Sequence, residues 1–317
     1  MSTGFKTLLL AHHTGDTSAA GRAIADFSGR VAQRSGGLLN IADMPGSTLG
    51  NIPALLRLVM DGQADMAFAP FDRLCELIPK FGFVGMPFVF DDLAHADRVL
   101  NGPFADWALP DLLQRGLHSL SSWEWGRRQI SNRVRPLQKP ADLAGLRIRV
   151  PPIAINLDAI QALGAMPVVV EFARLIPALR QGMVDGQENP VAIIHGYRLY
   201  EQQGYLSLLD YSYGAMLHII NRRSFEALSA EHQKILAEES RRAGQAMRLA
   251  LRTEELSQIE ALRTAGMRIE RPDPQPFRIA LQPARERLIE RFGAARGGSF
   301  LAMVEHLRAA PATEDAA

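Results

Sequence analysis

Apolar and polar positions alternate in short blocks through the first part of the chain. Residues 6–11 form a short apolar run, and residues 38–44 and 65–69 repeat this pattern after turn-rich segments. Between these runs, apolar side chains recur at helical spacing before Gly36 and again over residues 52–62. The order strand, helix, strand, helix, strand predicts a βαβαβ lobe.

Polar residues in the turns are expected to cap these helices. Thr17 or Ser18 precedes the first helical segment, and Ser47 or Thr48 precedes the second. The side-chain oxygens of such residues accept hydrogen bonds from the free N–H groups of a first helical turn.

Two unusual segments occupy the middle of the chain. Residues 81–90 are rich in Phe and interrupted by Gly and Pro, which predicts a buried loop that crosses a core. Helices are expected after it, near Val99 and Trp107. Residues 118–130 form a long extended run in which Trp123 and Trp125 face the same way. Its length suggests a strand that passes from one lobe into another.

The α/β alternation resumes after residue 145 and predicts a second lobe. Strands are expected at 146–150, 167–170 and 183–188, helices at 155–163, 173–181 and 191–200, and extended segments at 205–213 and 216–221, with Asn189 and Pro190 turning the chain out of its strand.

Arg149 is the last polar side chain of the strand at 146–150. Apolar residues alternate there with Arg147 and Arg149, and Pro151 stops the strand because proline cannot donate to a ladder. Ligands collect beyond the carboxyl ends of strands in open α/β sheets. A guanidinium is always charged and offers two parallel donors to a carboxylate. We therefore expect Arg149 to meet a ligand, whereas Arg147 is expected to be a solvated edge residue.

A long helix follows the second lobe. Residues 229–265 contain no Pro and one Gly, with Ser229 as the expected N-cap and Gly266 as the stop. About 36 residues would make a rod of roughly 54 Å, which exceeds one lobe. The alternative is two helices with a break near Gly244. The remainder predicts a strand and one or two helices over 267–307, and a disordered tail over 309–317.

Composition describes an ordinary globular protein and excludes some classes of function. The 317 residues carry 35 Lys+Arg and 34 Asp+Glu, a formal net charge of +1, which argues against a nucleic-acid-binding field. The single cysteine, Cys75, rules out an internal disulfide. No apolar run approaches the length of about 20 residues that spans a bilayer. The apolar run at 7–11 is too short for a signal-peptide core. Either the protein stays in the cytoplasm or a signal peptide has been removed and replaced by a starting Met.

Several motifs together resemble one family of binding proteins. Residues 128–133 read RQISNR, residues 145–151 read GLRIRVP and residues 184–190 read VDGQENP. With smaller landmarks such as the DGQADM run at 61–66, these closely resemble the solute-binding proteins of TRAP transporters, the DctP type. The resemblance covers roughly residues 6 to 300.

The resemblance implies a periplasmic receptor with a periplasmic-binding-protein-like α/β fold. Two lobes with mixed sheets would be joined by hinge-crossing strands and spanned by one long helix, and they would close over an organic acid and deliver it to a membrane permease. The expected lobes are residues 1–127 with 215–254, and residues 128–214 with 255–308. The resemblance implies that Arg149 grips the ligand carboxylate, that Arg128 assists and that Asn189 completes the site.

Further contacts are expected around that site. The matching loops after the first and third strands bring in His13 and Arg73, although Pro70 stands where several relatives have an acidic residue. Phe172, Trp125 and Tyr213 are candidate walls for the body of the ligand, and each could equally be plain core. These departures from the family pattern suggest a more apolar cleft. The resemblance implies a sugar acid or hydroxy acid as the ligand, and the apolar side chains make an aromatic or branched acid the alternative.

The residues favour binding over catalysis. Neither a G-x-G-x-x-G run after the first strand nor a Walker motif is present, so no cofactor is expected. His12 and His13 are adjacent and would point apart on a strand, so no metal site is expected. Asp185 and Glu188 are expected to brace Arg residues rather than act as acid and base. The alternatives are a stand-alone sensory binding protein and, less favoured, an enzyme with an Arg-lined acid site. A monomer is the default.

Overall fold

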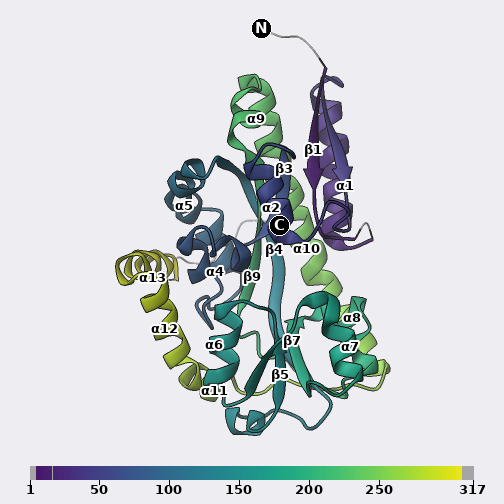
Figure 1. Ribbon diagram of the computed structural model, residues 1–317, viewed down its shortest axis with the longest axis vertical. Helices are drawn as coiled ribbons and strands as arrows, with labels where there is room; N and C mark the ends of the chain where they lie inside the picture. The colour runs from purple at the N-terminus through teal and green to yellow at the C-terminus, as the bar shows by residue number, and fades with distance from the viewer. Residues whose placement is uncertain (1–4, 16, 309–317) are drawn as a thin grey trace, which may run out of the picture.

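The computed structural model describes residues 5–15 and 17–308, and it shows two α/β lobes, one above the other in Figure 1. The first lobe is built on three parallel strands in the order β2-β1-β3. Their bounds are Lys6–Ala11 for β1, Leu39–Met44 for β2 and Met66–Pro70 for β3. The intervening helices are α1 (Ala19–Arg34) and α2 (Ile52–Met60). The predicted βαβαβ lobe is confirmed.

The helix caps of this lobe were predicted only in part. Ser18 caps α1 by accepting from the Gly21 N–H, as expected. The expectation that Ser47 or Thr48 caps α2 was wrong, because Asn51 does so by accepting from the Ala54 N–H at 3.1 Å. Ser47 lies instead in a turn, at a φ of 62°.

Two long antiparallel strands join the lobes. β4 runs from Leu117 to Asn132 and pairs with β9 (Tyr213–Asn221). The strand order β3-β9-β4-β7-β5-β6 carries the sheet from the first lobe into the second. The predicted lobe-crossing strand is confirmed, and Figure 1 shows it running down the middle of the molecule.

The second lobe surrounds the lower half of β4. Its strands are β5 (Arg147–Val150), β6 (Met166–Val169), β7 (Gly186–Pro190), β8 (Tyr205–Ser207) and β10 (Arg268–Glu270). Its helices include α6 (Ala154–Ala162), α7 (Leu175–Arg180) and α8 (Val191–Gly196). Short 3-10 turns lie at Pro140–Leu143, Phe172–Arg174 and Leu199–Glu201. The predicted turn at Asn189 and Pro190 was wrong, since both residues pair with β4 as part of β7. The helix predicted over 191–200 ends at Gly196, because Arg198 adopts a left-handed φ of 54°.

The spanning helix is a single element. α10 extends over 35 residues, Ala230–Thr264, with Ser229 capping the His232 N–H. It contacts α1 in the first lobe, α8 in the second and the crossing strand β4 between them. A break near Gly244 is excluded. A Cβ at Gly244 would lie 3.0 Å from the Trp123 ring, so the glycine allows the helix to approach β4 closely.

The aromatic segment at 81–90 fills the core of the first lobe, as predicted. It begins in a 3-10 turn, Pro79–Phe83, and Phe81, Phe83 and Phe90 are buried. Around it lie α3 (Phe71–Leu74), α4 (Leu93–Leu100) and α5 (Pro103–Gln114), while α9 (Arg222–Glu226) follows β9.

The C-terminal segment holds three helices rather than the one or two predicted. They are α11 (Pro274–Ala280), α12 (Gln282–Phe292) and α13 (Ala294–Arg308). α13 packs against α4 and α5, and its Phe300 joins the aromatic core of the first lobe. These contacts favour assigning α13 to the first lobe, although the sequence boundary placed 255–308 in the second. The tail predicted over 309–317 lies outside the described residues.

Candidate functional site

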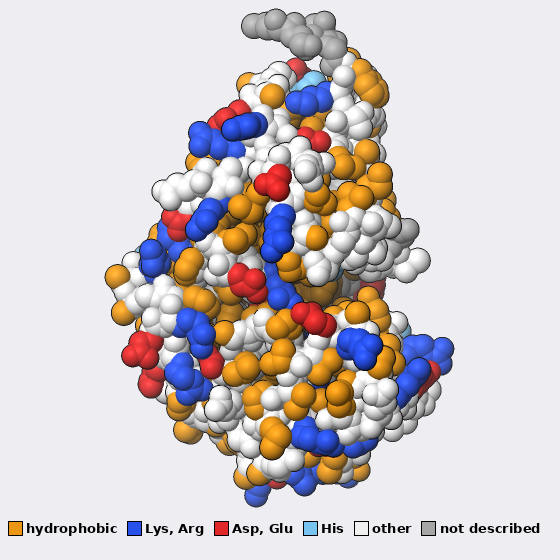
Figure 2. Space-filling model, viewed as in Figure 1, with side chains coloured by type: hydrophobic (Ala, Val, Ile, Leu, Met, Phe, Trp, Pro, Cys, Tyr) orange, Lys and Arg blue, Asp and Glu red, His pale blue; other side chains and the backbone are white. Residues whose placement is uncertain are grey.

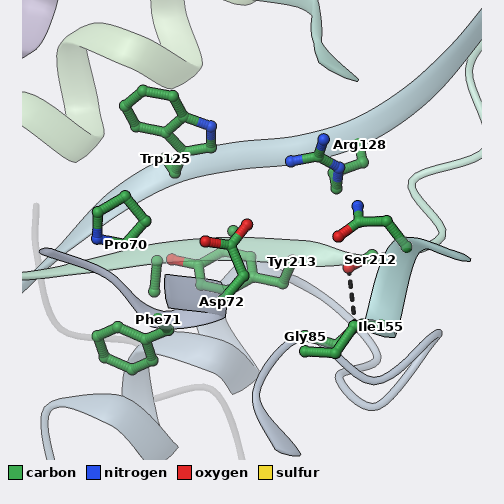
Figure 3. Close-up of a pocket in the computed structure, with 12 residues that line it drawn as sticks. Pro70, Phe71, Asp72, Gly85, Trp125, Arg128, Ile155, Ser212 and Tyr213 are labelled. Atoms are coloured by element: carbon green, nitrogen blue, oxygen red, sulfur yellow. Dashed lines mark hydrogen bonds between the residues drawn. The ribbon is translucent and has the colours of Figure 1, made fainter. Parts of the chain in front are cut away.

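A cavity lined by both apolar and polar side chains lies at the junction of the lobes, beside the crossing strands. Figure 2 shows a hollow between the upper and lower halves of the molecule. The cavity encloses about 360 Å³ when its open mouth is included. Figure 3 shows its wall: Pro70, Phe71 and Asp72 come from the end of β3 and from α3, Trp125 and Arg128 from β4, Ile155 and Asn156 from α6, and Ser212 and Tyr213 from the start of β9.

Arg128 projects from β4 and is held by a buried acidic partner. Its Nε and Nη2 donate to the carboxylate of Glu188, the Nη2 bond being 2.8 Å long. The Tyr211 hydroxyl and the Asn156 amide donate to the same carboxylate at 2.9 and 3.2 Å. Glu188 therefore neutralises Arg128 and is itself saturated with donors. Within the described residues, the third guanidinium nitrogen of Arg128, Nη1, has no hydrogen-bond partner.

Arg149 is the last but one residue of β5 and lacks such a partner. Its side chain is buried, with the residue only 1% exposed, and its Nε donates to the Val170 carbonyl at 2.7 Å. Its Nη2 is buried without a hydrogen-bond partner. Burial, the largest cause, lowers the pKa of Arg149 to about 10, and the nearby cations Arg128 and Arg73 act in the same direction. A buried cation in this state is complementary to an anion.

Asp72 was not among the residues predicted from the sequence. It follows β3 in the short helix α3, and its carboxylate lies between Trp125 and Arg128 in Figure 3. Burial raises the pKa of Asp72, while Arg128 and Arg73 act to lower it. Asn156 and Ser212 were also missed. Nothing in their local sequence marks them, because only the packing of α6 and β9 against β4 brings them to the cavity.

The remaining walls are aromatic. Trp125 packs against His13, with ring centroids 4.9 Å apart. Both ring nitrogens of His13 are buried without a partner, and burial lowers the pKa of His13 to about 4, so that its ring is neutral. Tyr213 lines the cavity and donates to Glu124 at 3.2 Å. Phe172 is 39% exposed and lies beside the Arg149 guanidinium, 6.0 Å from ring centroid to Cζ.

Of the predicted site residues, the cavity wall includes Trp125, Arg128 and Tyr213. Arg149, His13 and Phe172 are not among the residues that line it. Asn189 lies outside it, since its amide donates to Gln187 on the face of β7 opposite to Glu188. Arg73 also lies outside it and pairs with Glu76 at 3.4 Å. The ligand-binding roles of all these residues stay predictions.

Asp185 does brace arginines, as expected. It accepts from Arg147 and Arg133 at 2.8 and 3.0 Å, and the hydrogen bonds from Arg147 hold the pKa of Asp185 well below its usual range. Arg147 is thus partly exposed at the strand edge, as predicted, but it is paired rather than free.

Two further properties concern only residues 5–15 and 17–308. This part of the chain has no group of three or more His, Cys, Asp or Glu residues that could hold a metal ion. It also has no helix long and apolar enough to cross a membrane.

Comparisons with known proteins identify similar chains. The family model described as bacterial extracellular solute-binding protein, family 7, matches residues 10–291. The 2,3-diketo-L-gulonate-binding periplasmic protein YiaO of Escherichia coli (strain K12) is 31% identical over 268 residues, which are 84% of this chain and 82% of that protein.

Solved structures of sugar acid complexes share the fold. The sugar acid binding protein DctPAm of Advenella mimigardefordensis, in complex with galactonate, has a TM-score of 0.89 and 26% identity over 96% of this chain and 99% of that one. A TRAP periplasmic solute binding protein of Polaromonas sp. JS666, bound to D-erythronate, has a TM-score of 0.86 and 28% identity over 94% and 98%. The predicted resemblance and the predicted two-lobe fold are confirmed.

Proposed function

The chain belongs to family 7 of the bacterial extracellular solute-binding proteins, and we propose that its cavity binds a small sugar acid or hydroxy acid for delivery to a TRAP membrane permease. The family consists of binding proteins rather than enzymes. Receptors of this kind select a solute and pass it on unchanged, so the site needs complementarity rather than reacting groups.

One observation supports an acid as the ligand. Arg128 is neutralised by Glu188, whereas Arg149 is buried with an amino group that lacks a partner. An uncompensated buried charge costs several kcal/mol, and a ligand carboxylate would remove that cost when it binds. Charge-assisted hydrogen bonds contribute about 1.5–3 kcal/mol each, and micromolar affinity needs only about 8 kcal/mol in total.

The other polar groups of the cavity suit hydroxyl groups on the ligand. Asn156 and Ser212 lie in the same wall as Arg128. The Asn156 amide N–H donates to Glu188 and the Ser212 hydroxyl to the Gly85 carbonyl, so their oxygens can accept hydrogen bonds from a polyhydroxy chain. The relatives that bind 2,3-diketo-L-gulonate, galactonate and D-erythronate support sugar acids as the first compounds to test.

We infer binding without turnover because Glu188, the acidic group that holds Arg128 beside the cavity, is committed. Glu188 accepts from Arg128, Tyr211 and Asn156, so it lacks the free lone pair of a general base. We further infer that the protein works in the periplasm as a monomer, and sedimentation at increasing protein concentration tests the monomer.

The first experiment is a thermal-shift screen of the wild-type protein. Its compounds are aldonates, uronates, short hydroxy and keto acids, dicarboxylates and aromatic acids, with neutral sugars as controls. A ligand at 100 times its Kd stabilises the folded state by about 2.7 kcal/mol, which raises the Tm by several degrees. A response confined to acids supports the proposal, whereas a response confined to neutral sugars contradicts it.

Arg149 variants test the carboxylate contact itself. Arg149→Ala should abolish binding, and Arg149→Lys should weaken it at least tenfold, because an ammonium loses the planar fork of the guanidinium. The matched control is Arg147→Lys, two positions away on the same strand, where the side chain is paired with Asp185. Near-normal affinity of Arg149→Lys by calorimetry would contradict the two-pronged contact.

A further inference from the structure

We infer that Asp72 is the specificity-determining residue that accepts hydrogen bonds from ligand hydroxyl groups and disfavours a second carboxylate on the ligand. The inference rests on the proposed function, because it concerns the part of the ligand that lies away from Arg149. It narrows the ligand from any small sugar acid or hydroxy acid to a monocarboxylate with hydroxyl groups distal to its carboxylate.

Asp72 is placed to contact a ligand. It lines the cavity from the first-lobe side, whereas Arg128 and Asn156 line it from β4 and α6. Figure 3 shows its carboxylate directed into the space between Trp125 and the Arg128 guanidinium. A ligand that fills this space must therefore meet the carboxylate of Asp72.

The carboxylate has no structural role that would explain its position. Over the described residues, no hydrogen bond or ion pair involves the side chain of Asp72, and no side chain caps the short helix on which it lies. The neighbouring charges are already paired with one another: Arg73 with Glu76, and Arg128 with Glu188. Asp72 is thus an acidic group that lines the cavity without a partner of its own.

The chemistry of this group selects among acids. A carboxylate accepts hydrogen bonds through two oxygens, so one or two ligand hydroxyls would compensate the cost of its burial. Burial raises the pKa of Asp72, although Arg128 and Arg73 act to lower it. A second carboxylate at this end of a ligand would add like-charge repulsion at short range.

The test compares ligands that differ in their hydroxyl groups across three variants. Calorimetry would measure the Kd of D-erythronate, D-galactonate, 2-hydroxybutyrate and succinate with wild type, Asp72→Ala and Asp72→Asn. The control is Glu76→Gln, an exposed acidic residue on the next turn that pairs with Arg73. The compound 2-hydroxybutyrate keeps the carboxylate and the first hydroxyl of erythronate but lacks the two distal hydroxyls.

We expect Asp72→Ala to weaken binding of the polyhydroxy acid about 10- to 100-fold and binding of 2-hydroxybutyrate less than about 3-fold. Succinate should bind more tightly to both Asp72 variants than to wild type, and Glu76→Gln should change none of these values. An equal loss for all acids, or no loss for any, would overturn the role of Asp72.

A crystal structure of the wild type with D-galactonate provides an independent measurement. A ligand hydroxyl within about 3 Å of an Asp72 carboxylate oxygen supports the inference, and a ligand carboxylate or no ligand atom at that place overturns it. Failure of the wild type to bind any acid in the panel would instead overturn the proposed function, which separates the two failures.

Discussion

Two neighbouring arginines at the site differ in whether their charge is paired with a carboxylate. Arg128 and Arg149 both lie near Glu188, but only Arg128 bonds to it. Glu188 is fixed by three neighbouring side chains, so it cannot turn toward Arg149 without losing them. Two nitrogens of Arg128 are therefore held by Glu188 while its Nη1 stays available. The charge of Arg149 is not paired with a side chain of the described residues, so it can interact with an anion.

A buried histidine, His218, makes the free energy of unfolding depend on pH. It is 0% exposed on β9, stacks on Phe68 with ring centroids 4.3 Å apart, and exchanges a hydrogen bond with Ser240 at 2.8 Å. Burial lowers the pKa of His218 to about 3. In the unfolded chain its pKa is about 6.5.

The sign of the effect follows from these two values. Between pH 6.5 and 3 the unfolded chain binds a proton that the folded protein does not, so His218 lowers the free energy of unfolding as the pH falls. The slope for one proton is about 1.4 kcal/mol per pH unit. We expect His218→Phe, which keeps an aromatic ring against Phe68, to remove this component between about pH 6 and pH 4.

Urea denaturation of wild type and variant at several pH values measures the difference. Other groups titrate in the same range, for example Glu239, whose pKa is lowered to about 2, but they are common to both proteins. Parallel stability profiles for wild type and His218→Phe would contradict the prediction.

At the site, the sequence predicted where a residue lies along a strand more readily than what its side chain contacts. Arg149 could be found because an alternating strand stopped by Pro151 places the last polar residue at the strand end. Asp72 could not, because the direction of its side chain depends on how α3 turns after β3. Asn189 was expected at the site, but the alternation of β7 directs Glu188 toward Arg128 and Asn189 the other way.

Among the elements, β7 depends on a close approach that only glycine allows. A Cβ at Gly186 would lie 2.4 Å from the backbone oxygen of Ser131 on β4. Neither backbone can move away without breaking the ladder between β4 and β7. The DGQENP motif therefore has a structural reason for its glycine, which is separate from any role in binding.

We expect Gly186→Ala to lower the free energy of unfolding by about 1–3 kcal/mol, as overpacking usually does. The matched control is Gly204→Ala, because a Cβ at Gly204 would meet nothing within 4 Å. Chemical denaturation measures both. A loss in Gly204→Ala as large as that in Gly186→Ala would show that the cause is not the contact with Ser131.

Elements were predicted best where one signal ran over many residues. α10 has a long helical period, a Ser cap and a Gly stop, and its end points were predicted to within a residue or two. The early end of α8 was missed, since the residue that adopts the left-handed conformation after it, Arg198, is not a Gly. The third C-terminal helix was missed because α11 and α12 meet with little more than Leu281 between them.

For the whole molecule, the connections between lobes are unusually extensive. The strand β4 pairs with β9 in the first lobe and with β7 and β8 in the second, and α10 lies along β4. Arg252 of α10 bonds to Glu124 on β4 and to Asp97 on α4, which ties the helix to the first lobe. Arg127 of β4 bonds to Asp210 in the second lobe at 2.7 Å. An unfolded second lobe would therefore leave half of β4 and much of α10 without their partners.

This connectivity predicts a single unfolding transition although the protein has two lobes. The tryptophans offer a test, since all three lie in the first lobe or on the crossing strand: Trp107 on α5, Trp123 and Trp125 on β4. Tryptophan fluorescence thus reports on the upper half of the molecule, whereas far-ultraviolet circular dichroism reports on helices of both lobes. We expect the two signals to give the same midpoint in urea, because neither lobe retains its sheet when the other unfolds.

Adding a ligand gives a second form of this test, because an acid that bridges the two lobes stabilises them together. Saturation with a binding acid should move both midpoints by the same amount, and Arg149→Ala should show no movement of either. A dichroism transition that precedes the fluorescence transition would mean that the second lobe unfolds alone. In that case β4, β9 and α10 would connect the lobes without coupling their stability, and closure over the ligand would have to depend on the ligand contacts alone.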